Sequence, residues 1–82
     1  SSSLYLGYLV SSYARVYGEP LGEVLLPEYA RAVETLFDGE HAGNEVVAAL
    51  PRDPRAMFQP AFLAGFNAGR PSWLRRRLRE TR

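Results

Sequence analysis

The sequence contains no cysteine and no lysine. Without cysteine, neither disulfide bonds nor a thiolate metal site can stabilise a small core. All ten cationic side chains are arginines, for which a GC-rich bacterial coding sequence is one explanation among several. No residue pattern indicates a cofactor, and we expect none.

Histidine is almost as scarce, because His41 is the only one in the chain. A serine hydrolase needs a serine activated by a histidine that a carboxylate orients, and this serine commonly stands on a Gly-x-Ser-x-Gly turn. That turn is missing, and the serines are confined to positions 1–3, 11, 12 and 72. We therefore expect that the chain contributes no catalytic residue and is not an enzyme by itself.

Long apolar segments and a strong net charge are missing as well. No uninterrupted apolar stretch approaches the roughly 20 residues that cross a bilayer, and the first residues lack the basic segment of a secretion signal. We therefore expect no membrane-spanning segment, and the cellular compartment stays open. The formal net charge of +1 is too small to imply a general attraction to nucleic acid or to anionic lipid.

What is present is the composition of a globular protein. Hydrophobic residues make up 46% of the chain and charged residues 23%, which argues against disorder. The 82 residues suffice for one domain, which we place at residues 1–82. A domain of this size buries only about 60 to 65% of the surface of its unfolded chain, so its stability margin is small.

Proline and glycine divide the chain into short segments whose apolar residues recur with a helical period. This pattern predicts an all-α fold of about five to six short helices. The predicted segments are 3–17, 27–37, a short helix through Glu45 and Leu50, one turn at 54–58, 60–68 and a last helix that begins at Pro71. No segment predicts a strand.

The segment 3–17 predicts a helix with two neighbouring apolar stripes. Serines at its start can cap it, and Gly18 suits the left-handed position after its end. The stripe expected in the core contains Leu6, Val10, Tyr13 and Tyr17, and the second stripe contains Tyr5, Tyr8 and Leu9. A helix that is apolar over so much of its girth usually contacts two surfaces. We therefore expect the second stripe to remain accessible as a face for an apolar ligand or a partner.

Two further aromatic residues, Phe62 and Phe66, lie four positions apart and share one side of a predicted helix. We hypothesise that they border the same groove as Tyr5, Tyr8 and Leu9, with Gly65 permitting close contact of a ligand or a neighbouring backbone. In the last helix, Trp73, Leu74 and Leu78 are expected on the inward side.

Asp38, Glu40, His41 and Glu45 form an acidic segment around the single imidazole. His41 and Glu45 would share a face if both were helical. Zinc sites require a second histidine or cysteines, and a calcium loop that began at Asp38 would place Ala49 where its twelfth residue must be an acid. We therefore interpret the segment as a turn before a helix start, with no metal site.

The most basic stretch contains Arg75, Arg76, Arg77, Arg79 and Arg82. Phosphate recognition needs clustered cations of this kind. However, a helix that turns Trp73, Leu74 and Leu78 inward must place its arginines outward in any case. We therefore expect a solvated helix face and no nucleic-acid partner.

Several motifs, read in order, resemble a known family. They are Tyr8-Leu9-Val10-Ser11-Ser12-Tyr13 with Tyr17-Gly18, Leu26-Pro27-Glu28-Tyr29-Ala30, Leu36-Phe37-Asp38-Gly39-Glu40-His41-Ala42-Gly43-Asn44-Glu45, Ala48-Ala49-Leu50-Pro51, Phe58-Gln59-Pro60-Ala61-Phe62 and Trp73-Leu74-Arg75-Arg76-Arg77-Leu78. Over nearly the whole chain they resemble the helical cap of bacterial α/β-hydrolases of the secreted lipase and esterase type. The motifs are structural, and none is catalytic. One departure is Ala42, which lacks the side-chain oxygen of a capping box.

The resemblance implies a cap, or lid, that covers the active site of a catalytic α/β-hydrolase core and shapes its apolar acyl pocket. The nucleophile, acid and histidine would then belong to that core, and the parent enzyme would be a secreted or periplasmic hydrolase. The alternative is a stand-alone helical interaction module that forms a homo-oligomer. The expected partners are accordingly the catalytic core or a second copy, with an apolar acyl group as ligand.

Overall fold

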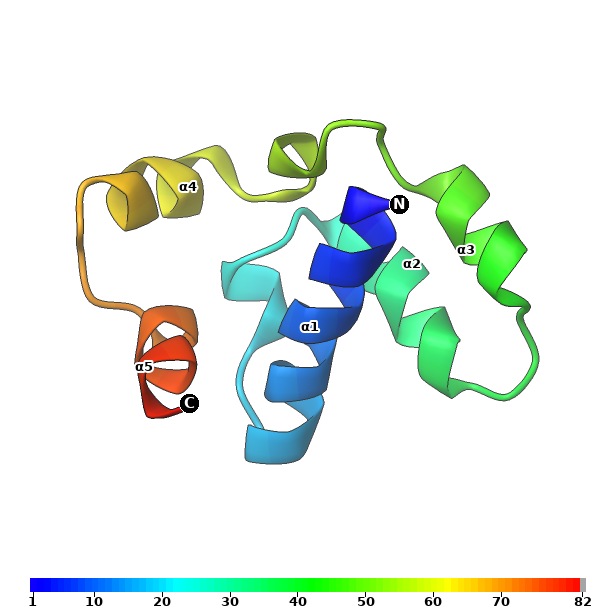
Figure 1. Ribbon diagram of the computed structural model, residues 1–82, viewed down its shortest axis with the longest axis horizontal. Helices are drawn as coiled ribbons and strands as arrows, with labels where there is room; N and C mark the ends of the chain where they lie inside the picture. The colour runs from blue at the N-terminus through cyan, green and yellow to red at the C-terminus, as the bar shows by residue number, and fades with distance from the viewer. Residues whose placement is uncertain (82) are drawn as a thin grey trace.

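The computed structural model describes residues 1–81, and in this range it contains five α-helices and three short 3₁₀ helices. The α-helices are α1 (Ser2–Tyr17), α2 (Pro27–Glu34), α3 (Gly43–Ala49), α4 (Pro60–Asn67) and α5 (Trp73–Glu80). The 3₁₀ helices are η1 (Leu21–Glu23), η2 (Thr35–Phe37) and η3 (Pro54–Met57). The all-α prediction is confirmed, since residues 1–81 contain no strand. In Figure 1, α1 and α2 occupy the centre, α3 lies to the right, and α4 and α5 lie to the left.

The ends of α1 follow from the residues at its boundaries. The Ser1 side chain accepts a hydrogen bond from the Leu4 N–H at 3.1 Å, which satisfies one of the free donors of the first turn. Gly18 adopts the left-handed conformation, with φ of 66°, that a side chain would disfavour. The predicted capping serines and the predicted glycine stop are thus both present.

The buried side of α1 differs from the predicted one. Its buried residues are small, and they are Ser3, Gly7, Val10, Ser11 and Ala14. The prediction that Tyr17 belongs to the core is wrong, because 48% of this side chain is exposed. Val10 is buried as predicted, and Leu6 and Tyr13 are partly buried against the core, so that Tyr17 is the one member of the predicted stripe that is exposed.

The core is formed by α1, α2, the segment around η1, the end of η3 and the first turn of α5. Its buried members are Val10, Ala14, Leu21, Val24, Leu25, Ala30, Val33, Met57, Trp73 and Leu74. The Trp73 indole N–H donates to the Pro20 carbonyl at 3.1 Å, so the one polar atom of this side chain is satisfied inside the core. This contact anchors α5 to the turn that follows α1.

Segments far apart in the chain meet beside η1. Leu25 and Phe58 form an isolated antiparallel bridge. The Leu26 N–H donates to the Met57 carbonyl at 2.9 Å, and the Gln59 N–H donates to the Val24 carbonyl at 2.8 Å. These bonds fix the start of α4 beside η1.

Two predicted details of the other helices require correction. The last helix begins at Trp73 and not at Pro71, because the Ser72 side chain caps it by accepting the Arg75 N–H at 3.0 Å. Leu78, expected on the inward side, is 37% exposed. The eight residues of α5 meet the core mainly through their first turn, which leaves the later apolar position at the surface.

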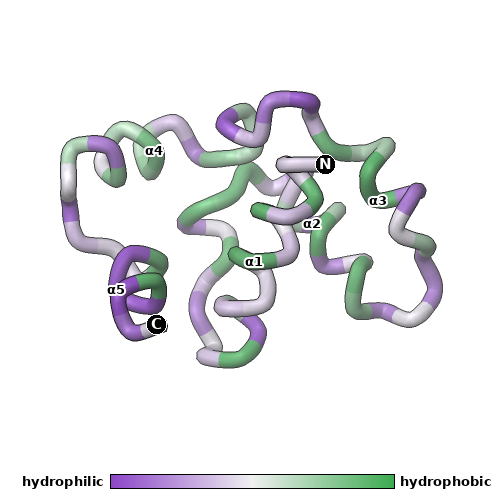
Figure 2. Tube along the Cα trace, viewed as in Figure 1, coloured by the Kyte–Doolittle hydropathy of each residue, from purple (hydrophilic) through white to green (hydrophobic). Residues whose placement is uncertain are grey.

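The hydropathy of the helices is uneven along the chain. Figure 2 shows many strongly hydrophilic positions on α5 and in the connections, whereas most positions of α1 are apolar or weakly polar. Within the described part of the chain, no helix has the length and apolar character needed to cross a membrane.

Candidate functional site

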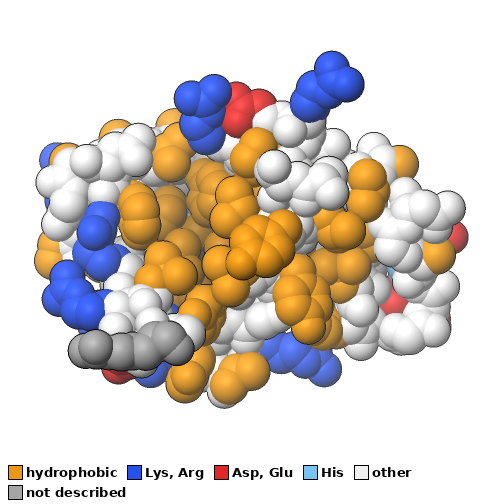
Figure 3. All heavy atoms as spheres, in the orientation of Figure 1, with side chains coloured by type: hydrophobic (Ala, Val, Ile, Leu, Met, Phe, Trp, Pro, Cys, Tyr) orange, Lys and Arg blue, Asp and Glu red, His pale blue; other side chains and the backbone are white. Residues whose placement is uncertain are grey.

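The outward face of α1 carries large apolar side chains. The exposed fractions are 66% for Tyr5, 54% for Tyr8 and 73% for Val16, and Leu9 is half-buried. Successive helical residues are rotated by about 100°, so Tyr5, Leu9 and Val16 fall within an arc of about 40°. Figure 3 shows the resulting band of apolar side chains over α1 in the middle of the molecule. We call Tyr5, Tyr8, Leu9, Val16 and Tyr17 the α1 face.

The α1 face carries no formal charge. Arg15 is the only charged residue of α1, and its guanidinium lies 4.9 Å from the centroid of the Phe37 ring, at the side of the helix that is turned towards η2. A surface helix normally places its charged residues outward and its large apolar residues inward. In α1, Arg15 is exposed and Val10 is buried as usual, but large apolar side chains are exposed as well and two serines are buried.

The rim of the α1 face is held in place on two sides. The Tyr8 ring stacks on Phe37, with centroids 5.8 Å apart. At the other end, the Arg77 guanidinium lies 4.1 Å from the centroid of the Tyr17 ring, and the Tyr13 hydroxyl donates to Thr81 Oγ1 at 2.7 Å. These contacts restrict the aromatic rotamers, so that a partner would find the face already ordered.

Phe62 and Phe66 belong to a different part of the surface. Their ring centroids are 5.7 Å apart, and Phe58 continues the aromatic row at 6.0 Å from Phe62. Phe62 lines a cleft of about 510 Å³ formed by η1, α4 and α5, and this cleft does not include Tyr5, Tyr8 or Leu9. This cleft therefore does not bring Phe62 and Phe66 together with Tyr5, Tyr8 and Leu9, although the sequence analysis predicted one groove for both sets.

Gly65 is approached by a neighbouring segment of the chain, in keeping with one of the two contacts expected for it. A Cβ atom at this position would contact the Arg70 side chain at 3.4 Å. The close approach that Gly65 permits is therefore made by the Arg70 side chain, in the segment that leads from α4 to α5.

A second cleft of about 520 Å³, which sequence reasoning missed, lies between α1 and α2. It is lined by Ser11, Ala14, Arg15, Glu19, Leu21, Glu34, Phe37 and Asp38. Two of its polar groups already have partners, since the Ser11 hydroxyl donates to the Tyr8 carbonyl at 3.2 Å and Glu19 accepts from Arg77 Nε at 3.0 Å. No local sequence signal marks this cleft, because it depends on how α1 and α2 cross.

The acidic segment forms an exposed turn. Asp38 Oδ1 accepts the backbone N–H groups of Glu40 and His41 at 2.8 and 3.1 Å, and Asp38 Oδ2 lies 2.6 Å from His41 Nδ1. The bond from the Glu40 N–H is the main cause that lowers the pKa of Asp38, and the Asp38 side chain raises the pKa of His41. Both carboxylate oxygens are therefore engaged within the turn.

A metal could find three side chains here, since ligand atoms of Asp38, Glu40 and His41 lie within 4.8 Å of one another. The hydrogen bonds of Asp38 account for this proximity without an ion. Because α3 begins only at Gly43, His41 precedes the helix, and the predicted shared helix face of His41 and Glu45 is wrong. Ala42 occupies the N-cap position without a side-chain hydrogen bond, in keeping with its lack of a side-chain oxygen.

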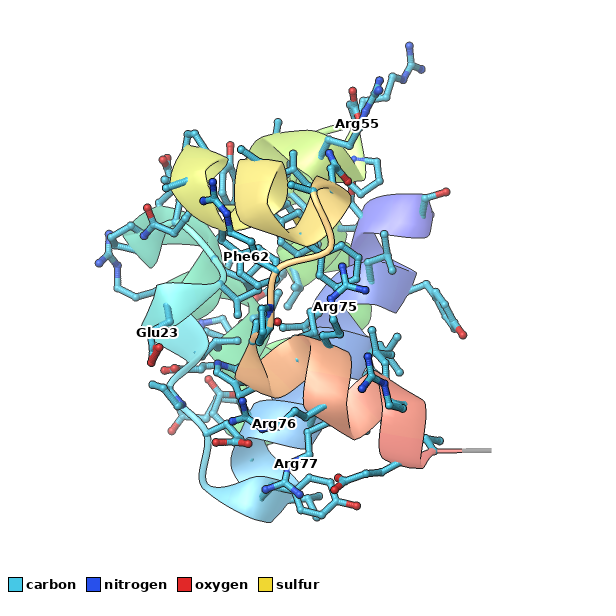
Figure 4. The ribbon with its side chains drawn as sticks, turned by 90° about the vertical axis from the view of Figure 1, so that its left-hand side faces the viewer. Glu23, Arg55, Phe62, Arg75, Arg76 and Arg77 are labelled. Atoms are coloured by element: carbon cyan, nitrogen blue, oxygen red, sulfur yellow. The ribbon has the colours of Figure 1, made fainter. Side chains whose placement is uncertain are left out.

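The arginines of α5 are not uniformly solvated, which corrects the sequence interpretation. Arg75 donates from Nε to the Arg70 carbonyl at 3.0 Å and from Nη2 to the Phe66 carbonyl, and its guanidinium covers the Phe66 ring at 4.2 Å. Arg77 binds Glu19 and Glu80, each at 3.0 Å. Figure 4 shows Arg75 between α4 and α5, with Arg77 towards the lower end of α5. Arg75 and Arg77 thus fasten α5 to its neighbours.

No protein-family model, curated protein or solved structure matches this chain. The geometry of the described residues therefore carries the functional argument. Within it, the α1 face stands out, because large apolar side chains point outward there while small and polar ones are buried.

Proposed function

We propose that this chain is a helical cap that lays its α1 face over an apolar surface of a catalytic α/β-hydrolase core, shapes the apolar substrate pocket and performs no catalysis alone. The observation that carries the proposal is the group of large apolar side chains on the exposed side of α1. Ser3 and Ser11 are buried on its inner side, while Tyr5, Tyr8 and Val16 are exposed on its outer side.

The energy of burial supports a partner for this face. Transferring one large apolar side chain from water to a packed interface stabilises the complex by about 1.5 to 3 kcal/mol. Tyr5, Tyr8 and Val16 do not gain this stabilisation within the chain, because each is more than half exposed. Contiguous exposed apolar side chains of this kind mark interaction surfaces in soluble proteins.

The polar chemistry supports catalytic groups that come from outside the chain. His41 is engaged by Asp38 in an exposed turn, and the Ser11 hydroxyl donates to a carbonyl of its own helix. A nucleophilic serine must instead donate to the base that activates it. In our proposal the triad belongs to the core, and this chain supplies the apolar cover.

A second candidate, a stand-alone interaction module that pairs with its own copy, is favoured by the lack of charge on the α1 face. Two copies can bring identical uncharged faces together without placing like charges opposite each other. The same five residues would then be covered by a twofold-related helix.

The coding frame that contains this chain distinguishes the candidates. The cap proposal expects the frame to encode a Gly-x-Ser-x-Gly turn and a later histidine, whereas a frame limited to this chain would contradict it.

In the complete gene product, Tyr5→Ser combined with Leu9→Ser is expected to lower kcat/KM for p-nitrophenyl octanoate by about tenfold and to leave the acetate ester unaffected. Val47→Ser, on the partly exposed surface of α3, is the matched control. Equal losses on both esters would contradict a cap that shapes the acyl pocket.

A further inference from the structure

The surface where α4 meets α5 combines arginines with exposed apolar side chains. Three adjoining depressions lie there, with volumes of about 320, 150 and 90 Å³. The largest is lined by Phe66, Arg75, Leu78 and Arg79. It shares Phe66 with the second and both arginines with the third, so the three depressions form one continuous surface.

The charges around this surface have one sign. Arg70, Arg75, Arg76 and Arg79 line the depressions, and none of the lining residues is acidic. In Figure 3, cationic side chains gather at the left edge of the molecule, over α5. The acid nearest in sequence, Glu80, is already engaged, because it pairs with Arg77, as Glu19 does. A ligand here would therefore meet several cations and no opposing carboxylate.

Arg75 is held in a binding geometry. Its guanidinium has five N–H donors, of which two are engaged by the carbonyls of Arg70 and Phe66. These bonds and the Phe66 ring fix the plane of the guanidinium. An arginine that is ordered before binding loses less side-chain entropy when it meets an anion.

The apolar part of the surface lies directly beside these cations. Phe66 is half-buried and Leu78 is 37% exposed, and both line the same depression as Arg75 and Arg79. Its volume of about 320 Å³ is at the lower end of the range of small-molecule pockets. A phosphate backbone would leave the apolar residues without a partner, whereas an anionic amphiphile matches both parts.

We propose that this surface binds a long-chain carboxylate, such as a fatty acid. The carboxylate of the ligand accepts hydrogen bonds from Arg75 and Arg79, with Arg76 beside them. The hydrocarbon chain of the ligand lies on Phe66 and Leu78. Charge-assisted bonds between a guanidinium and a carboxylate are among the stronger hydrogen bonds in proteins. The site requires only α4 and α5, so it does not depend on the proposed cap function or on the α1 face.

Calorimetric titration of the purified chain with laurate below its micellar concentration tests the site. We expect laurate to bind. Acetate, which lacks the hydrocarbon chain, and dodecyltrimethylammonium, which lacks the carboxylate, are each expected to bind at least about tenfold more weakly. Arg79→Glu is expected to weaken laurate binding by about tenfold, and added sodium chloride to weaken it further. Arg31→Glu, an exposed arginine on α2, makes the same change in net charge and should leave the affinity unchanged.

Backbone amide chemical shifts give a readout that does not depend on any variant. Laurate is expected to shift the amides of Phe66 and of residues 75–79. Shifts confined to α1, equal affinity for the cationic amphiphile, or an unchanged affinity in Arg79→Glu would overturn the proposal. Binding to phosphatidylglycerol vesicles without binding of monomeric laurate would instead identify a membrane surface as the partner and would also overturn it.

Discussion

Gly7 of α1 lies so close to Val33 of α2 that a Cβ atom at residue 7 would stand 2.7 Å from Val33 Cγ1. Val33 is fully buried, so its side chain has little room to withdraw. The contact sets the distance between the two central helices. It also determines which side of α1 faces the core, and therefore which side carries the α1 face.

Gly7→Ala is expected to destabilise the domain although alanine is the better helix former. Overpacking costs about 1 to 3 kcal/mol, which exceeds the gain of about 1 kcal/mol in helix propensity. Thermal unfolding followed by circular dichroism should show a lower Tm. Gly43→Ala is the control, because a Cβ atom at residue 43 would meet nothing within 4 Å. A Tm that rises in Gly7→Ala would show that α1 and α2 are less closely packed than described.

Local chemistry made several of the helix boundaries predictable. Ser1 and Gly18 end α1 as expected, and Pro27 and Pro60 each stand at the start of a helix, where a missing N–H does no harm. These signals act within a few residues of each other, so a single sequence displays them.

Contacts between distant segments could not be predicted in the same way. Tyr17 is exposed at the end of α1, where its ring is contacted by the Arg77 guanidinium of another helix. Arg77 loses its solvated role because it meets Glu19, 58 positions earlier in the chain. The exposed apolar residues on α1 were predicted from the sequence. The arginine surface of α5 could not be predicted, because it depends on how the turn between α4 and α5 places the two helices.

Two adjacent serines in α1 are expected to respond oppositely to substitution by alanine. Ser12 Oγ is buried and has no hydrogen-bond partner among residues 1–81, whereas the buried Ser11 hydroxyl donates to the Tyr8 carbonyl. Ser12→Ala removes an unsatisfied polar atom and should raise the free energy of unfolding of the domain by about 1 kcal/mol. Ser11→Ala loses a bond and leaves a small cavity, and should be neutral or destabilising. Urea unfolding measures both, and a destabilised Ser12→Ala would mean that its hydroxyl is satisfied in solution.

The Asp38–His41 pair predicts a pH dependence. The pKa of His41 is raised in the folded state. The contribution of His41 to the stability of the folded state is therefore fully present below its ordinary pKa of 6.5, and it is lost as the pH rises through the raised pKa. The pKa of Asp38 is lowered in the folded state. The contribution of Asp38 to stability is therefore present above its ordinary pKa of 3.8, and it is lost as the pH falls through the lowered pKa. The pair therefore stabilises the turn most between about pH 4 and 6.5.

An NMR titration of the His41 ring tests this coupling. Asp38→Asn is expected to lower the pKa of His41 towards its ordinary value, because the hydrogen bond that His41 Nδ1 donates to the Asp38 carboxylate is the main cause of the raised value. Asp53→Asn, which removes an exposed carboxylate paired with Arg55, should leave the pKa of His41 unchanged. If Asp38→Asn does not move the pKa of His41, the turn is not formed in solution.

The isolated chain is expected to self-associate through the α1 face, since pairing with a second copy covers the exposed apolar side chains. Sedimentation from micromolar to millimolar concentration should show a monomer–dimer equilibrium. Tyr5→Glu should weaken the dimer by about tenfold or more, because it places a charge in an uncharged interface. Val47→Glu on α3 should have no effect. A wild-type chain that stays monomeric throughout would argue against self-association through this face.

The central claim is that a partner covers the α1 face, and hydroxyl-radical footprinting tests it most directly. The oxidation rates of Tyr5 and Tyr8 would be compared between the dilute isolated chain and the complete gene product, with Val47 as an internal reference. The account predicts rapid oxidation of both tyrosines in the isolated chain, where they are 66% and 54% exposed, and strong protection of both in the complete protein. Equal oxidation of these tyrosines in the two samples would contradict it.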